Sequence, residues 1–344
     1  MNEIKLTQFS PGAGCGCKIS PADLEEILIG SKSTKEFKNL LVGNESKDDA
    51  AVYEIEGGKA IISTTDFFTP IVDDPFNFGR ISATNAISDI YAMGGTPLMA
   101  IAILGWPLEK LSKESASEVV NGARSVCDAA GIPLAGGHSI SISDPIFGLA
   151  VTGIANVCDI KKNSDSKVGD TLYLTKPIGI GLVTSAEKYK IAIEEDKLQA
   201  LKLMTTLNKP GEKLSVIKGV NSMTDITGFG LLGHCLEMAE GSDLCANIEF
   251  EKVPLIGGVD FYIENEAIPG GTFRNFASYG QRVSPLTERQ KMILCDPQTS
   301  GGLLISVSAE SDEAVKLLAI KEGFELYKIG YMALKTGEYS VEIY

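Results

Sequence analysis

Positive charge is scarce in this chain: 31 Lys and Arg residues stand against 45 Asp and Glu residues among 344, a formal net charge of −14. A surface of that sign repels phosphate backbones and anionic lipid head groups. Nucleic acid and membrane surfaces are therefore poor partners for this protein. Any phosphate ligand needs a local cationic device, either a few lysines or a divalent metal ion.

Long apolar runs and abundant cysteine are also missing. The least polar uncharged stretches, 97–108 and 145–158, are shorter than the ~18 apolar residues that a membrane-spanning helix needs. The first residues lack the apolar core of a signal peptide. The seven cysteines are an odd number and thinly spread. These absences favour a cytoplasmic protein with reduced thiols over a disulfide framework.

Two common nucleotide motifs are absent or doubtful. No P-loop sequence occurs, which excludes that phosphate cradle. Residues 228–233, GFGLLG, match the dinucleotide fingerprint by letter, but Asp225 lies where an apolar strand should precede it. We interpret the segment as a tight strand-to-helix turn whose helix N-terminus favours an anion. Structural zinc is a weak interpretation, because His138 and His234 are the only histidines.

The order of elements predicts the fold class. The length favours two domains, and strand patterns intermix with helical ones and with a hairpin turn at Gly57 and Gly58. This pattern favours an α+β fold over a doubly wound parallel sheet. A polar, lysine-rich stretch at 157–167 predicts a linker. Helices are expected from residue 20 and over 78–93, 112–130, 181–190, 194–207, 230–240 and 311–322. Strands are expected over 51–56, 59–64, 97–104, 145–155, 168–175, 245–253, 302–308 and 325–332. One further strand is expected to end at residue 136.

A glycine-rich segment near the N-terminus carries two cysteines. Residues 12–18 read GAGCGCK, so small residues let the backbone approach a ligand closely and predict a mobile segment. Lys18 stands three residues after Cys15, and its charge would favour the nucleophilic thiolate. A flexible tail with incidental thiols is the other interpretation. Because buried cysteines normally lie in apolar runs, we favour a reactive role for Cys15 or Cys17.

Acidic residues gather at the ends of predicted strands and on one helix. Ser or Thr residues shortly precede each of them: Asp48 and Asp49, Asp66, Asp89 with Asn85 one helical turn before it, and Asp225. A single aspartate of this kind is usually a turn or cap residue. The set as a whole suits Mg²⁺, which takes a few carboxylates and leaves its other positions to water and phosphate oxygens. The sequence thus predicts a metal–nucleotide site.

Two more segments, 136–139 (GGHS) and 297–302 (PQTSGG), read as loops rich in backbone donors. His138 in the first of them is equally compatible with a satisfied loop histidine.

These motifs together resemble the selenophosphate synthetase family, also called the selenide, water dikinases. The matching blocks are GAGCGCK at 12–18, GNESKDDAA at 43–51, STTDFF at 63–68, ATNAISDI at 83–90, AGGHS at 135–139, MTDITGFG at 223–230 and CDPQTSGG at 295–302. The cysteine segment is the specific part, whereas the wider aminoimidazole-ribonucleotide-synthetase-like superfamily shares the rest. The likeness covers essentially the whole chain and is faint over 189–220 and 240–270.

The resemblance implies a two-domain fold of that superfamily. It implies a flexible catalytic loop at 1–18, an ATP-binding and dimerisation domain at 19–157 and a C-terminal α+β domain at 168–344. It also implies a homodimer whose N-terminal domains pair into a shared β-barrel, with ATP and Mg²⁺ bound near the interface. Potassium is a further candidate cation.

The resemblance also implies roles for individual residues. Cys15 corresponds to the catalytic residue and Lys18 to the essential lysine beside it. Asp49, Asp89 and Asp225 correspond to the magnesium carboxylates. The nucleotide is expected to contact Lys18, Ser46, Lys47, Asp48, Asp66 and Asp89, and the ATP of the partner subunit to contact Gly137, His138 and Ser139.

The implied reaction converts ATP, selenide and water into selenophosphate, AMP and phosphate, which supplies activated selenium for selenocysteine and selenouridine. A selenium-delivery protein is a candidate partner. Cys15 could bind selenium covalently, orient the nucleophile or act in loop closure. Another kinase or cyclase of the superfamily, such as thiamine-monophosphate kinase, would leave the cysteine segment without a role. A thiol-based selenium or metal carrier would leave the aspartates without one.

Overall fold

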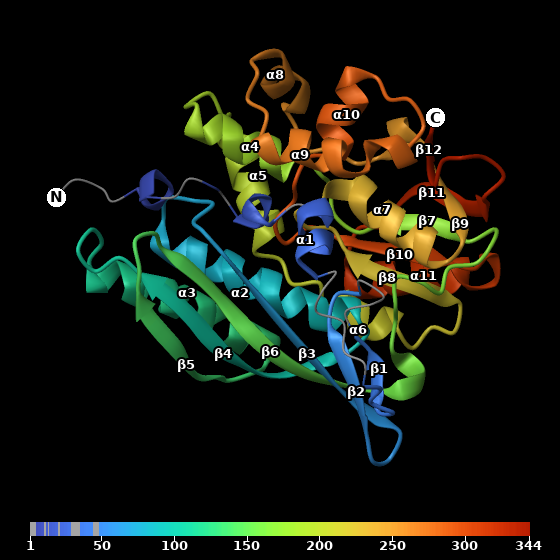
Figure 1. The fold of residues 1–344 in the computed structure, drawn as a ribbon, viewed down its shortest axis with the longest axis horizontal. Helices are drawn as coiled ribbons and strands as arrows, with labels where there is room; N and C mark the ends of the chain where they lie inside the picture. The colour runs from blue at the N-terminus through green and yellow to red at the C-terminus, as the bar shows by residue number, and fades with distance from the viewer. Residues whose placement is uncertain (1–4, 10–11, 13, 20, 29–34, 44–47) are drawn as a thin grey trace.

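Two six-stranded sheets organise the chain in this computed structural model (Figure 1). The structure describes residues 5–9, 12, 14–19, 21–28, 35–43 and 48–344. The first sheet has the order β1-β2-β3-β6-β4-β5, and the second has the order β12-β9-β11-β7-β10-β8. The mixture of helices with largely antiparallel sheets confirms the α+β class.

The first sheet uses strands that all lie before residue 157. They are β1 (Leu40–Val42), β2 (Ala51–Ile55), β3 (Lys59–Phe68), β4 (Thr96–Trp106), β5 (Leu134–Ser141) and β6 (Ile146–Asn156). The predicted hairpin is confirmed, because β2 and β3 pair antiparallel around Gly57 and Gly58, which both have positive φ. Helices α2 (Pro75–Ala92) and α3 (Lys113–Ala130) cover one face of this sheet (Figure 1).

Helix α2 is the element that later positions the site. It begins at Asp74, whose side chain accepts a hydrogen bond from the Asn77 amide at 2.8 Å, and Pro75 occupies its first turn. Two glycines let α2 and α3 pack closely. A Cβ at Gly79 would lie 1.8 Å from the Val119 carbonyl oxygen, and a Cβ at Gly122 would lie 2.0 Å from the Phe76 carbonyl oxygen. The resulting close packing leaves the residues of α2 from Ile81 to Ala92 buried.

The second sheet and its helices follow residue 170. The strands are β7 (Thr171–Leu174), β8 (Val220–Asp225), β9 (Leu244–Ile248), β10 (Leu303–Val307), β11 (Tyr327–Leu334) and β12 (Val341–Ile343). The helices are α4 (Ile180–Lys188), α5 (Glu194–Met204), α6 (Pro210–Leu214), α7 (Gly230–Gly241), α8 (Val259–Glu264), α9 (Gly270–Tyr279), α10 (Glu288–Leu294) and α11 (Asp312–Glu322). The turn interpretation of GFGLLG is confirmed, since β8 runs into α7 through it.

Short elements complete the chain. They are α1 (Pro21–Leu28) and the 3₁₀ turns η1 (Leu6–Phe9), η2 (Gly14–Cys17), η3 (Val157–Asp159), η4 (Phe250–Lys252), η5 (Gly280–Arg282) and η6 (Ala309–Ser311). All seven cysteines are free thiols. Among the described helices, none is both long and apolar enough to cross a membrane.

Three local predictions differ from the structure. The strand expected over 245–253 ends at Ile248, and η4 follows it. The segment 136–139 was expected as a loop but belongs to the edge strand β5. The linker is not a free tether, because Lys161 and Asn163 are buried and the Asn163 amide donates to Asp48 Oδ1 at 2.9 Å. The composition of residues 157–167 indicates only that the segment is polar. The contact with Asp48 could not be predicted from it, because Asp48 is far away in the sequence.

Candidate functional site

The site forms where three elements bring acidic side chains together. Asp66 lies near the end of β3, Asp89 lies on the inward face of α2, and Asp225 ends β8. Asp49 precedes β2 and reaches the same place, where its Oδ1 accepts a hydrogen bond from Thr224 Oγ1 at 2.8 Å. Residues from both sheets are therefore needed to assemble the cluster.

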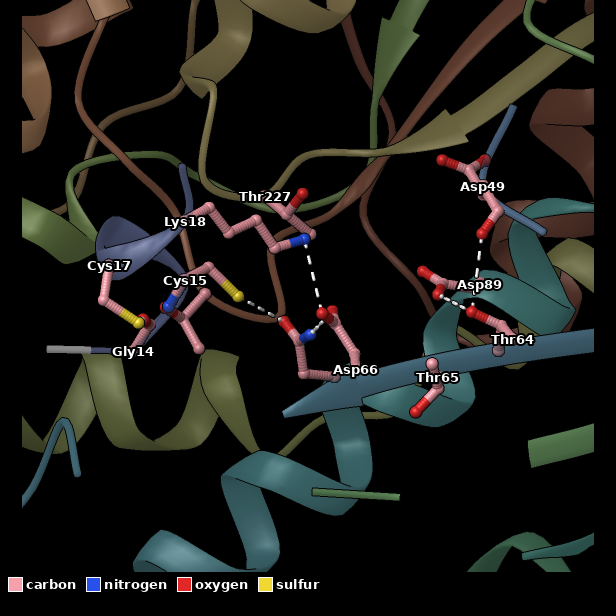
Figure 2. Close-up of polar contacts among 12 residues, drawn as sticks. Gly14, Cys15, Cys17, Lys18, Asp49, Thr64, Thr65, Asp66, Asp89 and Thr227 are labelled. Carbon is pink, nitrogen blue, oxygen red and sulfur yellow. Dashed lines mark hydrogen bonds and ion pairs between the residues drawn. The ribbon is translucent and has the colours of Figure 1, made fainter. Parts of the chain in front are cut away.

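Cys15 lies in η2 beside this cluster and is fully buried, with an exposed fraction of 0%. Its thiol donates to Asn85 Oδ1 at 3.2 Å, which is the dashed line from the Cys15 sulfur in Figure 2. Its amide donates to Thr299 Oγ1 at 3.0 Å. A Cβ at Gly228 would lie 2.5 Å from the Cys15 carbonyl oxygen, so a glycine is required for this close approach. The expectation that a cysteine among glycines is not buried is wrong at Cys15.

Asn85 joins the cysteine to the charged residues. Its Oδ1 also accepts the Ser300 amide at 2.7 Å, and its Nδ2 donates to Asp66 Oδ2. On the other side of Asp66, Lys18 Nζ lies 3.4 Å from Oδ1 (Figure 2). A continuous polar path therefore runs from the Cys15 thiol through Asn85 and Asp66 to the Lys18 ammonium.

The protonation of Cys15 differs from the sequence prediction. Burial raises the pKa of the Cys15 thiol well above its usual value, and the nearby Lys18 lowers it by less. The Asp66 carboxylate adds to the upward shift. Cys15 is therefore a neutral thiol that donates a hydrogen bond, and the thiolate expected from the Lys18 charge is not the form in this conformation.

Lys18 keeps its charge in the same surroundings. Partial burial lowers its pKa, but the carboxylates of Asp66, Asp89 and Asp225 raise it by more, so the net shift is upward. The side chain is 35% exposed. Lys18 thus presents a permanent cation to any anion that enters beside the carboxylates.

Burial and, to a smaller extent, mutual repulsion raise the pKa values of the clustered aspartates. Burial raises the pKa of Asp49, Asp89 and Asp225, and the neighbouring carboxylates raise the pKa of Asp49 and Asp89 further. A hydrogen bond from Thr64 Oγ1 to Asp89 Oδ2, at 2.5 Å, offsets only part of this cost. Without a bound cation, the ionised carboxylates of the cluster repel one another.

Two oxygen atoms indicate what the cluster can hold. Asp49 Oδ2 and Asp225 Oδ2 are buried and have no hydrogen-bond partner among the residues that the structure describes. Buried carboxylate oxygens without partners suit a hard cation. Within those same residues, no three His, Cys, Asp or Glu side chains are arranged to enclose one metal ion.

The remaining predicted residues are Ser46, Lys47, Asp48, Gly137, His138 and Ser139. Ser46 and Lys47 fall outside the described residues, and Asp48 contacts the linker amide of Asn163. Gly137, His138 and Ser139 lie exposed on β5, separated from β3 by β6 and β4. The structure therefore does not bring these three residues to the acidic cluster of their own chain.

Several residues of the site carry no motif that assigns them a role. Thr299 and Ser300 lie in a segment read only as a loop of backbone donors, yet they hold Cys15 and Asn85. Thr64 and Thr224 hold two of the aspartates. The only sequence signal is their position next to the acidic motifs, because hydroxyl side chains of this kind are common in any strand or turn.

Comparison with known proteins gives matches over the whole chain. The family model of the AIR synthase related protein, N-terminal domain, matches residues 47–155, and that of the C-terminal domain matches residues 167–341. The selenide, water dikinase of Aeromonas hydrophila is 55% identical over 100% of this chain and 99% of its own length. The selenide, water dikinase of Pseudomonas aeruginosa is 57% identical over 95% of each chain.

Solved structures share the fold at low identity. The thiamine-monophosphate kinase of Stenotrophomonas maltophilia has a TM-score of 0.65 and 16% identity, with 95% of this chain and 96% of that chain covered. The hydrogenase maturation protein HypE in complex with ATP has a TM-score of 0.62 and 18% identity, with 96% and 89% covered. These likenesses confirm the predicted superfamily fold.

Proposed function

Because the chain belongs to the selenide, water dikinase family, we propose that it makes selenophosphate, AMP and phosphate from ATP, selenide and water at the site that contains Cys15 and Lys18. The polar path from the Cys15 thiol through Asn85 to Asp66 and Lys18 carries this proposal. It joins the thiol to the acidic cluster, so both act on one substrate complex. A kinase without thiol chemistry would use only the acidic cluster, and a carrier without ATP chemistry would use only the thiol.

The chain's own residues account for the electrostatics of phosphoryl transfer. Transfer of a phosphoryl group depends mainly on positioning and on neutralising phosphate charge. Lys18 supplies a fixed cation, and Asp49, Asp89 and Asp225 are the residues that would hold Mg²⁺. When bound, Mg²⁺ neutralises and orients the phosphates of ATP. Asp66 then orients Lys18 on one side and Asn85 on the other.

Burial of Cys15 gives this site a way to exclude water. The neutral thiol is enclosed by Asn85, Thr299 and the backbone of Gly228. Opening of this contact would expose the thiol to solvent, where its pKa falls towards the usual value and the Lys18 charge favours the thiolate. We infer that the segment around Cys15 closes over selenide and limits hydrolysis of ATP before transfer.

Product analysis tests the proposed reaction. With ATP, Mg²⁺ and selenide, we expect the protein to form AMP, phosphate and selenophosphate in equal amounts, and with selenide omitted we expect AMP formation to fall by at least about tenfold. The products are measured by ³¹P NMR under anaerobic conditions. Formation of ADP with thiamine monophosphate would instead identify a thiamine-monophosphate kinase. Selenium binding without ATP consumption would identify a carrier.

We also propose a homodimer built on the uncovered face of the first sheet. Helices α2 and α3 cover the other face (Figure 1). Six large apolar side chains of the uncovered face are each 38–51% exposed, namely Tyr53, Ile55, Phe67, Met99, Ile101 and Ile140. An apolar surface of this extent typically marks a protein interface. Pairing of two such faces would form the β-barrel that the family resemblance implies.

The register places His138 on this same face. His138 pairs with Ile103, Ile103 pairs with Gly148, and Gly148 pairs with Phe67. Side chains paired directly across strands share a face, and successive residues alternate. Phe67 therefore points away from the site and its neighbour Asp66 towards it. His138 is suited to reach the nucleotide of a partner subunit rather than that of its own chain.

Mixed dimers test this arrangement. Asp49→Asn and His138→Ala subunits are each expected to be inactive as homodimers. A heterodimer of the two contains one site with both lesions and one with neither, so we expect about half of the wild-type activity per dimer. Two affinity tags isolate the heterodimer, and AMP release measures its activity. Absence of recovery in a verified heterodimer would contradict the shared site.

The remaining expectations stay predictions from the family resemblance. They are the division into segments 1–18, 19–157 and 168–344, a potassium requirement and a selenium-delivery partner.

A further inference from the structure

Lys176 is a buried lysine that the proposed reaction does not use. It follows strand β7 and is 5% exposed. Its ammonium donates to three backbone carbonyl oxygens, those of Leu203 at 3.2 Å, Thr206 at 2.7 Å and Ser300 at 3.0 Å. Across the described residues, no carboxylate forms an ion pair with it. All three donors of the ammonium are therefore directed at carbonyl groups.

Two of these carbonyls belong to the end of helix α5. Leu203 lies in its last turn, and Thr206 follows it. The carbonyl groups at a helix C-terminus lack intrahelical partners and carry partial negative charge, so a lysine is favourable there. Burial still lowers the pKa of Lys176, to about 7, and the Asp225 carboxylate only partly opposes this shift. Burial of the ammonium costs free energy, and its hydrogen bonds to the three carbonyl oxygens offset that cost.

The third carbonyl connects Lys176 to the candidate site. Ser300 has a φ of +53°, which is unfavourable for a residue with a side chain. Its amide donates to Asn85 Oδ1 at 2.7 Å, and the preceding Thr299 accepts the Cys15 amide at 3.0 Å. Lys176 therefore contacts a strained residue that holds the partner of the Cys15 thiol.

The two glycines that follow Ser300 are also held in place. Asn208 Nδ2 donates to the Gly301 carbonyl oxygen at 2.8 Å, and the Gly301 amide donates to the Ile226 carbonyl oxygen at 3.1 Å. A Cβ at Gly302 would lie 2.4 Å from the Lys176 amide nitrogen. Gly301 and Gly302 are thus fixed by packing and backbone contacts. The carbonyl of Ser300 is held by Lys176.

We propose that Lys176 is a positioning residue for the reaction, because its ammonium fixes the Thr299–Ser300 segment that holds Cys15 and Asn85 beside Asp66 and Lys18. The hydrogen bonds of the Lys176 ammonium go to backbone carbonyl oxygens and not to the carboxylates of the acidic cluster. The inference rests on the proposed function for its effect on turnover, whereas its effect on Cys15 is independent of turnover.

The test uses Lys176→Met, which keeps the length of the side chain and removes its donors. In a Cys17→Ser background, we expect Cys15 to react with iodoacetamide about tenfold faster than in the matched parent, as loss of a charged hydrogen bond implies. We also expect kcat for AMP formation to fall about tenfold while the KM for ATP changes less than about twofold. Mass spectrometry of the Cys15 peptide and steady-state kinetics give the two readouts.

Controls separate positioning from loss of the fold. Lys202→Met removes an exposed lysine from the same helix α5 and should change neither readout. The buried thiols Cys127 and Cys235 should stay unreacted in Lys176→Met. Lys176→Gln, which keeps two amide donors, should restore part of the protection of Cys15. Partial rescue of this kind is not expected of a residue that only fills space.

Three outcomes would overturn the proposal. The first is a folded Lys176→Met protein in which both Cys15 labelling and kcat equal those of the parent. The second is equal exposure of Cys15, Cys127 and Cys235, which would show a general structural role. The third outcome applies if Lys176→Met does not fold. The test then uses Lys176→Gln, and a rate of Cys15 labelling in that variant equal to the rate in the parent would overturn the proposal. Failure of the parent to use selenide would contradict the proposed function but leave the labelling result valid.

Discussion

Cys15→Ser protein is expected to form AMP from ATP and selenide about 100-fold more slowly than the wild type, or slower still, while its thermal unfolding changes little. The serine hydroxyl is close in size to the thiol and can still donate to Asn85 Oδ1, which Cys15 Sγ reaches at 3.2 Å. The fold and the polar path to Lys18 should therefore survive. The loss would report the chemistry of the sulfur atom, measured as selenide-dependent AMP release.

Cys17→Ser is the matched control for this substitution. Cys17 lies in the same turn but is exposed, and its thiol donates to the Gly14 carbonyl oxygen at 2.9 Å. We expect its activity to stay within about threefold of the wild type, because it lies outside the path to Asp66. Equal losses in both variants would contradict the assignment of Cys15 and would favour a site that uses two thiols.

Replacement of the clustered aspartates has the second large effect, and it acts on activity and stability in opposite directions. Asp89→Asn and Asp225→Asn should each lower Mg²⁺-dependent nucleotide binding at least about tenfold, because an amide is a poorer ligand for a hard cation. The same variants should unfold at a higher temperature than the wild type when divalent cations are absent. The expected gain is about 2–4 °C for each kcal/mol of repulsion removed.

The sign of the stability effect follows from the shifted acidities. The pKa of Asp89 in the folded protein is raised above its usual value, so the folded state binds a proton more tightly than the unfolded state. This contribution to stability is complete below the usual carboxyl pKa and is lost as the pH rises through the folded value. Cation-free wild-type protein should therefore lose stability over this window, and Asp89→Asn should flatten the loss. Added Mg²⁺ should restore stability at neutral pH.

Isothermal titration calorimetry with Mg²⁺ and a non-hydrolysable ATP analogue, together with thermal unfolding in EDTA, checks both parts. Asp128→Asn, an exposed position on α3, is the control and should change neither value. The effects of Asp49→Asn, Asp89→Asn and Asp225→Asn should be non-additive if the residues share ions. Strict additivity, or a lower unfolding temperature without cation, would indicate separate structural roles.

The sequence by itself determined the elements whose signals are local. Gly57 and Gly58 predicted the hairpin, and the pattern around residues 228–233 predicted the turn into α7. The spacing of motifs also determined the family, because the glycine-rich cysteine segment occurs with the aspartate blocks in one chain. Each of these signals depends on residues close together in the chain, where turn chemistry and periodicity act directly.

Only the tertiary structure decided the state of Cys15 and the role of Lys176. The glycines around Cys15 predicted a thiol that is not buried, and the charge of Lys18 predicted a thiolate, whereas the thiol is buried and neutral. Its partners Asn85 and Thr299 lie 70 and 284 residues away in the chain. Burial and pKa depend on the density of atoms and charges that such distant segments bring together. A lysine after a short strand has no distinguishing local pattern, so its contact with Ser300 emerges only when the segments pack.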